Sequence, residues 1–204
     1  MIKIHGVAMT KTIDYYNQNA DNFIVGTKDV GFSDIQNEFI SFLPTGAKIL
    51  DFGCGSGRDA KAFMEKGYKV IAVDGSVEIC RIASEYLGTE VKQMLFDELD
   101  ETDEYDGIWA CASILHADYS ELSNILQGIY RALKIKGVFY TSFKYGSFQG
   151  ERNGRFFTDL DEASWDKLME ELPGFVNKKI WITGDARPGR ENEKWLNVIA
   201  IKEK

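Results

Sequence analysis

The stretch ILDFGCGSGRD, residues 49–59, decides the fold of this chain, because an apolar strand runs into an aspartate and then into three glycines at alternate positions. Glycines at 53, 55 and 57 allow positive φ and let the backbone approach a ligand that any Cβ would keep away. A helical pattern follows from about Gly57, and the unpaired N–H groups at a helix start bind a carboxylate or a phosphate. The stretch predicts a strand, a loop and a helix that together bind a nucleotide-type cofactor.

Spacing separates three kinds of cofactor loop. A Walker loop requires Gly-Lys-Ser/Thr, and the absence of lysine from residues 49–60 excludes it. A dinucleotide loop, G-x-G-x-x-G, would place its third glycine at Arg58 or, counted from Gly55, at Ala60, so only a degenerate version is possible. The remaining pattern is Asp-x-Gly-x-Gly-x-Gly, which begins at Asp51. This pattern resembles the first motif of the class I S-adenosylmethionine-dependent methyltransferases, whose cofactor carries a cationic sulfonium and no phosphate.

A second acid follows at the distance expected of a ribose-binding residue. The apolar strand at 68–73 ends in Asp74, which lies 23 residues after Asp51. In this kind of βαβ unit a carboxylate about 20 residues further on binds the ribose diol, and it repels the 2′-phosphate of NADP. The alternative role of Asp74 is an N-cap for the helix that begins near Ser76, and the two roles are compatible.

Two more strand ends extend the resemblance over roughly residues 47–116. Residues 91–97 end in Phe-Asp, and the resemblance implies that this acid binds the adenine amino group while the phenylalanine covers the ring. Residues 105–116 form a buried strand that breaks at Ser113, similar to the fourth motif, which passes under the methionine part of the cofactor. The resemblance implies S-adenosylmethionine as cofactor and S-adenosylhomocysteine as product. The expected cofactor-binding residues are Asp51, Gly53, Cys54, Gly55, Gly57, Arg58, Asp74, Gly75, Ser76, Phe96, Asp97, Ala112 and Ser113, with Arg58 meeting either the methionine carboxylate or a local acid.

Composition limits the partners. The chain has 204 residues and a net charge of −8, which is unlike the basic footprint of a nucleic-acid binder. Its three cysteines are widely spaced and it has two histidines, so we expect reduced thiols and no metal site. No apolar run reaches the length of a membrane span, and the first residues lack a signal-peptide core. We therefore expect a cytoplasmic protein without membrane or nucleic-acid partners, in which residues 1–9 are dispensable. The oligomeric state is left open.

Apolar runs and helical patterns alternate along the chain, which predicts an α/β fold with a doubly wound, mostly parallel sheet. The resemblance implies seven strands and an antiparallel C-terminal hairpin. We expect a single domain over 1–204, with a helical lid or N-terminal extension at 1–43 and a candidate acceptor loop at 145–158. The expected strands lie near 47–52, 69–74, 91–95, 106–112, 137–144, 175–183 and 194–202, and the expected helices near 11–25, 32–42, 57–66, 77–87, 120–134 and 161–171.

Methyl transfer from a sulfonium is an in-line displacement, so alignment of the two partners is the main task of the protein. A base is needed only where the acceptor must lose a proton. His116 is the candidate base because its ordinary pKa is near neutral, and its alternative role is packing or capping at a loop start. The run 13–23 resembles the Tyr-rich lid helix of small-molecule methyltransferases, which makes Tyr16 a catalytic and Tyr15 an acceptor-binding candidate. The alternative is an aromatic face packed on the sheet.

Basic residues near the candidate acceptor loop suggest an anionic acceptor. The stretch 143–158 is long, aromatic and glycine-rich, as functional loops often are. If its cations converge, they can bind a carboxylate or a phosphate, and the alternative is that each pairs with a nearby acid such as Glu151, Asp159 or Glu191. The candidate acceptor-binding cations are Lys144, Arg152, Arg155, Arg187 and Arg190.

Three classes of function remain. The first is methyl transfer to a small molecule, similar to the methyltransferases of ubiquinone/menaquinone biosynthesis and tellurite resistance. The second is methyl transfer to RNA or protein. Residues 112–115 read Ala-Ser-Ile-Leu and lack the Asn/Asp-Pro-Pro-Tyr/Phe with which base N-methyltransferases hold a flipped base. The third is a non-catalytic cofactor-binding module or an NAD-type Rossmann protein.

Overall fold

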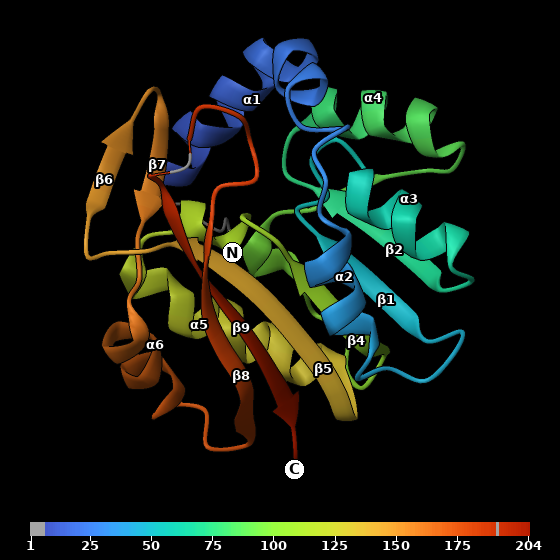
Figure 1. Ribbon diagram of the computed structural model, residues 1–204, viewed down its shortest axis with the longest axis vertical. Helices are drawn as coiled ribbons and strands as arrows, with labels where there is room; N and C mark the ends of the chain where they lie inside the picture. The colour runs from blue at the N-terminus through green and yellow to red at the C-terminus, as the bar shows by residue number, and fades with distance from the viewer. Residues whose placement is uncertain (1–6, 191) are drawn as a thin grey trace.

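Seven strands form one sheet in the order β3-β2-β1-β4-β5-β9-β8, as seen in the computed structural model of the chain, which describes residues 7–190 and 192–204 (Figure 1). Strands β3, β2, β1, β4 and β5 pair in parallel, whereas β9 is antiparallel to both β5 and β8. The predicted α/β fold with an antiparallel C-terminal hairpin is thus confirmed. The strands are β1 (Lys48–Phe52), β2 (Lys69–Asp74), β3 (Lys92–Gln93), β4 (Tyr105–Ala110), β5 (Leu133–Lys144), β8 (Phe175–Gly184) and β9 (Lys194–Lys202).

The helices begin at local capping signals. Ser76 accepts a hydrogen bond from the N–H of Ile79, and Asp118 and Asp161 form capping boxes at the next two long helices. The α-helices are α1 (Val7–Val25), α2 (Ser33–Ile40), α3 (Arg58–Glu65), α4 (Val77–Leu87), α5 (Tyr119–Ala132) and α6 (Glu162–Met169), with two short 3-10 helices, η1 (Phe96–Glu98) and η2 (Ile114–His116). Among the described residues, no helix is long and apolar enough to cross a membrane.

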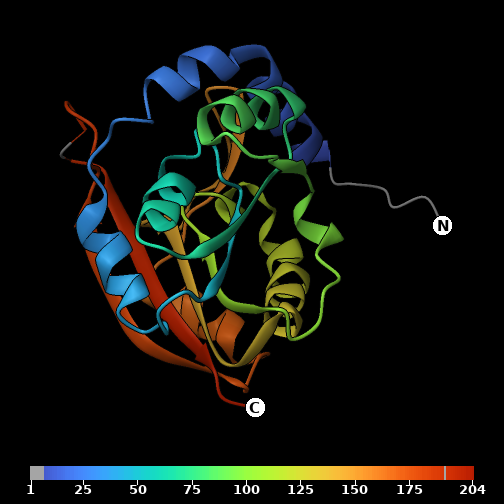
Figure 2. The ribbon, with the colours of Figure 1, turned by 90° about the vertical axis from the view of Figure 1, so that its right-hand side faces the viewer.

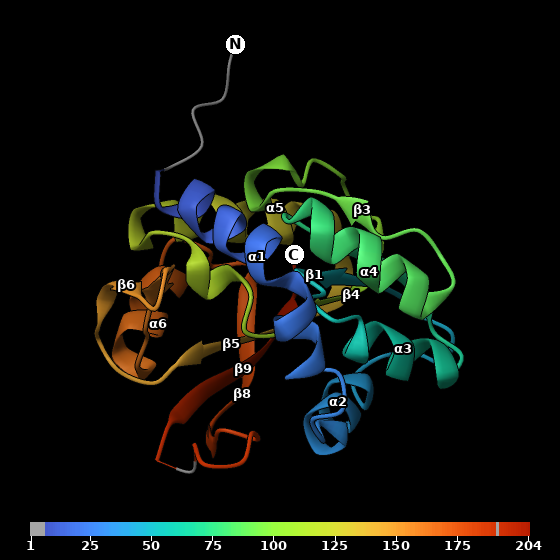
Figure 3. The same cartoon turned by 90° about the horizontal axis from the view of Figure 1, so that it is seen from above.

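Alternate residues of the central strands face opposite helical layers. Ile108 and Phe139 belong to the core shared with α5 and α6, whereas Trp109 and Tyr140 belong to the core shared with α2 and α3. Trp109 and Tyr140 stack with ring centroids 4.0 Å apart. Figures 2 and 3 show α5 on one side of the sheet and α2 on the other. Because both faces are covered, the central strands are apolar on both sides, as their continuous apolar runs predicted.

Helix α1 lies across the edge of the sheet at which the parallel strands end, between α4 on one side and the strands β6 and β7 on the other (Figures 1 and 3). Its backbone departs from helical geometry at Asn19, where φ is −122° and ψ is 18°. Asn17 accepts a hydrogen bond from the Ser76 hydroxyl at 2.6 Å, which joins α1 to the start of α4. The expected N-terminal extension thus forms a helix over this edge, and residues 1–6 of that extension lie outside the described residues.

The candidate acceptor loop is a β-hairpin, which corrects the expectation of a loop over 145–158. Strands β6 (Gln149–Arg152) and β7 (Arg155–Thr158) pair antiparallel, and the turn residues Asn153 and Gly154 have φ of 50° and 79°. Asn-Gly is the preferred pair for a two-residue turn of this kind. The Asn-Gly dipeptide is therefore a sequence signal for a hairpin, which the prediction of a loop did not take into account.

Candidate functional site

A cavity of about 220 Å³ lies at the carboxyl ends of the strands, under α1. It is lined by the loops that follow β1, β2, β4 and β8, together with parts of α1, β5 and β7. Ligands of open α/β sheets bind at this edge. The predicted site residues that line the cavity are Tyr16, Gly53, Cys54, Gly55, Arg58, Asp74, Gly75, Ser76, Phe96, Ala112, Ser113, His116, Lys144, Arg155, Arg187 and Arg190.

The remaining predicted site residues lie outside this lining. Asp51 lies within β1, and Gly57 is the N-cap of α3. Tyr15 is a neighbour of Arg155. Asp97 follows Phe96 in η1, and it is Phe96 together with Met94 and Leu95 that lines the cavity there. Arg152 is in β6 and does not reach the cavity. The described residues that line the cavity therefore include most, but not all, of the predicted set.

The three glycines of the cofactor loop adopt the predicted backbone. Gly53, Gly55 and Gly57 have φ of 84°, 53° and 76°. A Cβ on Gly53 would lie 2.5 Å from the Cβ of Ser113, so this glycine is required by close packing as well as by φ. The N–H groups of Gly53 and Cys54 both donate to the carbonyl of Val73 at 2.9 Å, which fastens the loop to the end of β2.

Asp74 ties two of the cavity loops together. Its carboxylate accepts hydrogen bonds from the N–H of Gly55 and from the N–H of Ser76, each at 3.0 Å. Burial raises the pKa of Asp74, and the backbone N–H groups oppose that rise because they stabilise the charged form. Helix α4 is capped by Ser76, so the alternative role of Asp74 as the N-cap falls away.

Arg58 meets a local acid, which was one of its two predicted roles. Its guanidinium donates to both oxygens of Asp59 at 2.8 Å, and Asp59 also accepts from Gln36 and from the indole of Trp109. In contrast, Asp51 has a buried carboxylate oxygen without a hydrogen-bond partner. Burial, with a further contribution from the charge of Asp59, holds the pKa of Asp51 well above its usual range.

These acids and glycines fit S-adenosylmethionine better than a dinucleotide. The one cation on the cofactor loop, Arg58, is held by Asp59 and is not directed at a phosphate. Asp74 places its carboxyl oxygens at the cavity, and these suit the hydroxyl and ammonium groups of that cofactor better than they suit a pyrophosphate. Side chains of Ser113 and Phe23 lie close against the bare backbone at Gly53 and Gly55, where any Cβ would overlap them.

Tyr16, His116 and Arg155 form a hydrogen-bonded cluster on the cavity wall. The Nδ1 atom of His116 lies 2.6 Å from the carbonyl oxygen of Phe156, and because a carbonyl only accepts, Nδ1 carries the proton. The Nε2 atom then accepts from the Tyr16 hydroxyl at 2.9 Å. Burial lowers the pKa of His116 to about 4, and the nearby charge of Arg155 acts in the same direction. His116 is therefore a neutral imidazole at neutral pH.

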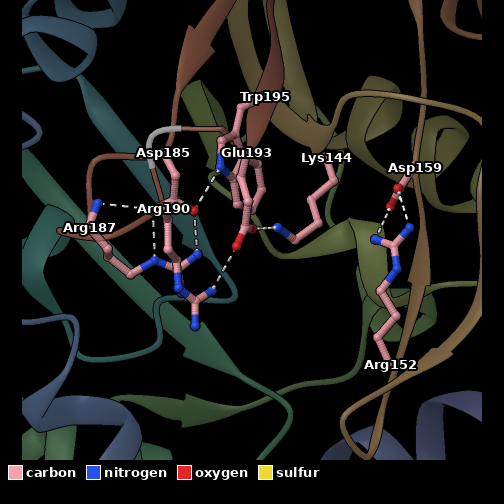
Figure 4. Close-up of polar contacts among 8 residues, drawn as sticks. All are labelled: Lys144, Arg152, Asp159, Asp185, Arg187, Arg190, Glu193 and Trp195. Carbon is pink, nitrogen blue, oxygen red and sulfur yellow. Dashed lines mark hydrogen bonds and ion pairs between the residues drawn. The ribbon is translucent and has the colours of Figure 1, made fainter.

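Four of the five candidate acceptor-binding cations pair with acids (Figure 4). Lys144 pairs with Glu193, which Arg190 also approaches at 3.6 Å. Arg152 donates to the two carboxylate oxygens of Asp159 at 3.0 and 2.6 Å, and the Nε atom of Arg187 donates to Asp185 at 2.8 Å. The alternative of pairing with acids thus holds for these four residues. Asp159 was an expected partner, Glu193 and Asp185 were not, and Glu191 lies outside the described residues.

Arg155 differs from the other four. Within the described part of the chain it has no carboxylate partner, and its Nε atom is buried without a hydrogen bond. Its guanidinium lies over the rings of Tyr15 at 4.9 Å and Phe157 at 5.2 Å, and Nη1 donates to the Tyr16 hydroxyl at 3.4 Å. Four of the five predicted cations thus line one cavity, and among the described residues Arg155 is the one of these four without a paired acid.

Several cavity residues were missed by the sequence analysis. Phe23 of α1 would lie 3.2 Å from a Cβ on Gly55, and Phe32 packs under the Arg58 guanidinium at 4.4 Å. Trp195, at the start of β9, donates to Asp185 at 3.1 Å. Phe23 belongs to the aromatic run of α1 that was noted in the sequence, whereas no local pattern marks the other two as cavity residues.

The comparisons with known proteins agree with this site. A family model described as "Methyltransferase domain" matches residues 49–137. A Burkholderia thailandensis 1,6-didemethyltoxoflavin-N1-methyltransferase, solved with 1,6-didemethyltoxoflavin and S-adenosylhomocysteine bound, superposes with a TM-score of 0.76 at 18% identity, over 100% of this chain and 93% of that chain. No curated protein matches the sequence.

Two further solved structures share the fold. A Methanosarcina mazei S-adenosylmethionine-dependent methyltransferase gives a TM-score of 0.69 at 19% identity, over 84% of this chain and 98% of that chain. The cyclase SpnF gives 0.72 at 14% identity, over 98% of each chain. At these identities the structures establish the fold, and the family model together with the cofactor-loop motif establishes the cofactor. Residues 49–137 thus match a methyltransferase domain, and the chain has the fold of the class I S-adenosylmethionine-dependent methyltransferases.

Proposed function

We propose that this chain transfers the methyl group of S-adenosylmethionine to a small-molecule acceptor. The observation that carries the proposal is the meeting, in one cavity under α1, of the glycine loop with a separate polar cluster of Tyr16, His116 and Arg155. Such a cavity provides one wall for the cofactor and another for an acceptor. The volume of about 220 Å³ is below the usual range for ligand sites, which suits a small acceptor.

On this proposal the cofactor-binding residues hold the cofactor in a fixed orientation. Asp74 binds the ribose hydroxyls, Phe96 covers the adenine ring, and Asp97 binds the adenine amino group from just outside the cavity lining. When bound, the cofactor supplies a methyl group on a sulfonium that is already an activated leaving group. The remaining work of the protein is to align the acceptor with that methyl and to exclude water, and alignment alone can contribute several kcal/mol of the barrier.

Tyr16 is the proposed contact of the acceptor, and His116 acts behind it. Because its proton points to Nε2 of His116, the Tyr16 oxygen presents a lone pair to the cavity. That lone pair can receive a proton from an acceptor N–H or O–H while the proton of Tyr16 passes to His116. A bound cofactor would leave as a neutral thioether, and its positive charge would pass with the methyl group to the acceptor and then, as a proton, through Tyr16 to His116.

Three observations favour a small molecule over a nucleic acid or a protein. The chain is acidic, with a net charge of −8, and the fourth motif lacks the residues that hold a flipped base. The Burkholderia neighbour has a small heterocycle bound in the same fold. The cyclase neighbour shows that this fold also carries other chemistry, so methyl transfer must be tested directly.

The test has two parts. Calorimetric titrations with S-adenosylmethionine, S-adenosylhomocysteine and NAD examine the cofactor, and we expect binding of the first two alone. Incubation with methyl-labelled S-adenosylmethionine and a cell lysate separated into small-molecule, RNA and protein fractions examines the acceptor. We expect label in the small-molecule fraction. Transfer to RNA or protein alone would refute the small-molecule acceptor, and binding of NAD instead of S-adenosylmethionine would overturn the assignment of the cofactor.

A further inference from the structure

We infer that the acceptor is a planar organic anion and that Arg155 binds its negative group. This inference rests on the proposed function and adds to it the charge and shape of the acceptor. It also separates Arg155 from the cations that share the cavity wall. Lys144, Arg187 and Arg190 line the cavity as well, but each of them pairs with an acid: Lys144 and Arg190 share Glu193, and Arg187 pairs with Asp185.

The first argument is the hydrogen-bonding capacity of Arg155. A guanidinium has five N–H donors, and among the described residues this one makes a single hydrogen bond, from Nη1 to the Tyr16 hydroxyl at a long 3.4 Å. Its Nε atom is buried and has no partner in the described structure. A buried donor without a partner costs free energy, whereas a carboxylate or an ionised ring heteroatom would satisfy several donors at once. Arg155 is therefore prepared for an anion that the protein does not itself supply.

The second argument is the rigidity of its position. Arg155 begins β7 and pairs with Arg152 across the tight Asn153–Gly154 turn. The turn is packed against α1, because a Cβ on Gly154 would lie 2.8 Å from the Tyr15 ring. The neighbouring residue Phe156 donates its N–H to Thr12 of α1 at 3.0 Å. The hairpin and α1 thus hold the guanidinium at the cavity wall, where an ionic bond costs little further ordering.

The third argument concerns the shape of the acceptor. The guanidinium lies among the rings of Tyr15, Tyr16 and Phe157, at 4.9, 5.8 and 5.2 Å. Tyr16 and Phe157 also line the cavity, and flat aromatic walls favour a flat ligand that stacks on them. The Tyr16 lone pair adjoins the guanidinium, so one acceptor can place its anionic group on Arg155 and a neighbouring N–H or O–H on Tyr16. An aromatic or heteroaromatic acid has this combination of groups.

The experiment compares matched acids and amides on the protein saturated with S-adenosylhomocysteine. The probes are benzoate, salicylate and nicotinate, each against its carboxamide, and binding at millimolar concentration is followed by saturation-transfer NMR. Charge-assisted hydrogen bonds are worth enough to give a preference of about tenfold for the acids. We expect Arg155→Gln to abolish this preference. The matched control Asp185→Asn/Arg187→Gln, which removes a paired cation of the same cavity together with its acid, should keep it.

Outcomes that overturn the inference are distinct from failure of the proposed function. Lack of acid preference in the unmodified protein, including a lack of any acid binding, overturns it without reliance on a variant. Persistence of the preference in Arg155→Gln, or its loss in Asp185→Asn/Arg187→Gln alone, overturns the assignment to Arg155. Calorimetry with S-adenosylhomocysteine on the same samples confirms the folded site, and its failure would instead count against the proposed function. Because Arg155→Gln leaves no carboxylate unpaired, we expect normal melting, and Arg155→Met serves as a second neutral variant.

Discussion

Replacing Gly53 by alanine measures how tightly the cofactor loop is packed. At φ of 84° an alanine carries the cost of the left-handed region, about 1–2 kcal/mol. Its Cβ would also lie 2.5 Å from the Cβ of Ser113, whose hydroxyl donates to the carbonyl of Phe52 at 2.7 Å. Relief of that overlap requires movement of backbone, and overpacking of this kind costs about 1–3 kcal/mol. We expect Gly53→Ala to lower the free energy of unfolding by about 2–5 kcal/mol in total.

Gly67 offers a matched control. Its φ is 85°, almost equal to that of Gly53, but a Cβ there would meet nothing within 4 Å. Gly67→Ala should therefore carry the backbone cost alone, about 1–2 kcal/mol. Urea denaturation of the three proteins gives the free energies of unfolding, and calorimetry gives the affinity for S-adenosylhomocysteine. We expect only Gly53→Ala to lose that affinity.

The difference between the two variants isolates the packing term. If Gly53→Ala and Gly67→Ala destabilise the protein equally, the loop relaxes freely and the close approach to Ser113 has no energetic consequence. If Gly53→Ala is destabilised but binds S-adenosylhomocysteine normally, the loop is packed as described but does not contact the cofactor. Either result would refute the reasoning that this glycine serves both the fold and the site.

Three other substitutions test the remaining groups. Asp74→Asn should weaken S-adenosylhomocysteine binding by about tenfold or more, because an amide accepts from the ribose less well than a carboxylate, and unchanged calorimetric affinity would remove Asp74 from the site. His116 has a folded pKa of about 4, below that of an unfolded histidine, so the unfolded chain binds the extra proton between about pH 6.5 and 4. The free energy of unfolding should therefore fall by up to about 3 kcal/mol as the pH drops through that window. His116→Asn should flatten this part of the stability profile in urea titrations. Asp51→Asn removes a carboxylate whose buried charge is unfavourable above its unfolded pKa. At pH 8 we therefore expect the free energy of unfolding to rise by about 0.5–2 kcal/mol and cofactor binding to weaken. A loss of stability would contradict the described environment of Asp51.

The fold was predictable because its signals are local. The strands that become β1, β2 and β5 are apolar runs, and the glycine loop between β1 and α3 has a spacing that few backbones satisfy. The third predicted strand, near 91–95, shortens to Lys92–Gln93, because the chain leaves the sheet and Phe96 turns into η1. The hairpin β6–β7 also has a local signal, because the dipeptide Asn153–Gly154 favours a two-residue turn within the segment 145–158 that was predicted to be a loop.

Prediction of the cofactor and prediction of the acceptor therefore differ in kind. Some of the groups that fit the cofactor are held by contacts at short sequence separation. Asp74, for example, accepts hydrogen bonds from Ser76, two positions away, and from Gly55, 19 positions away. The acceptor wall depends on contacts across the chain: Tyr16 meets His116 at a separation of 100 residues and Arg155 at 139. Charge pairing obeys the same limit, since nothing near Lys144 in the sequence shows that Glu193, 49 residues later, neutralises it. Five similar cations in the sequence become one available cation only after tertiary pairing, so the specificity of the enzyme follows from its folded contacts and not from its motifs.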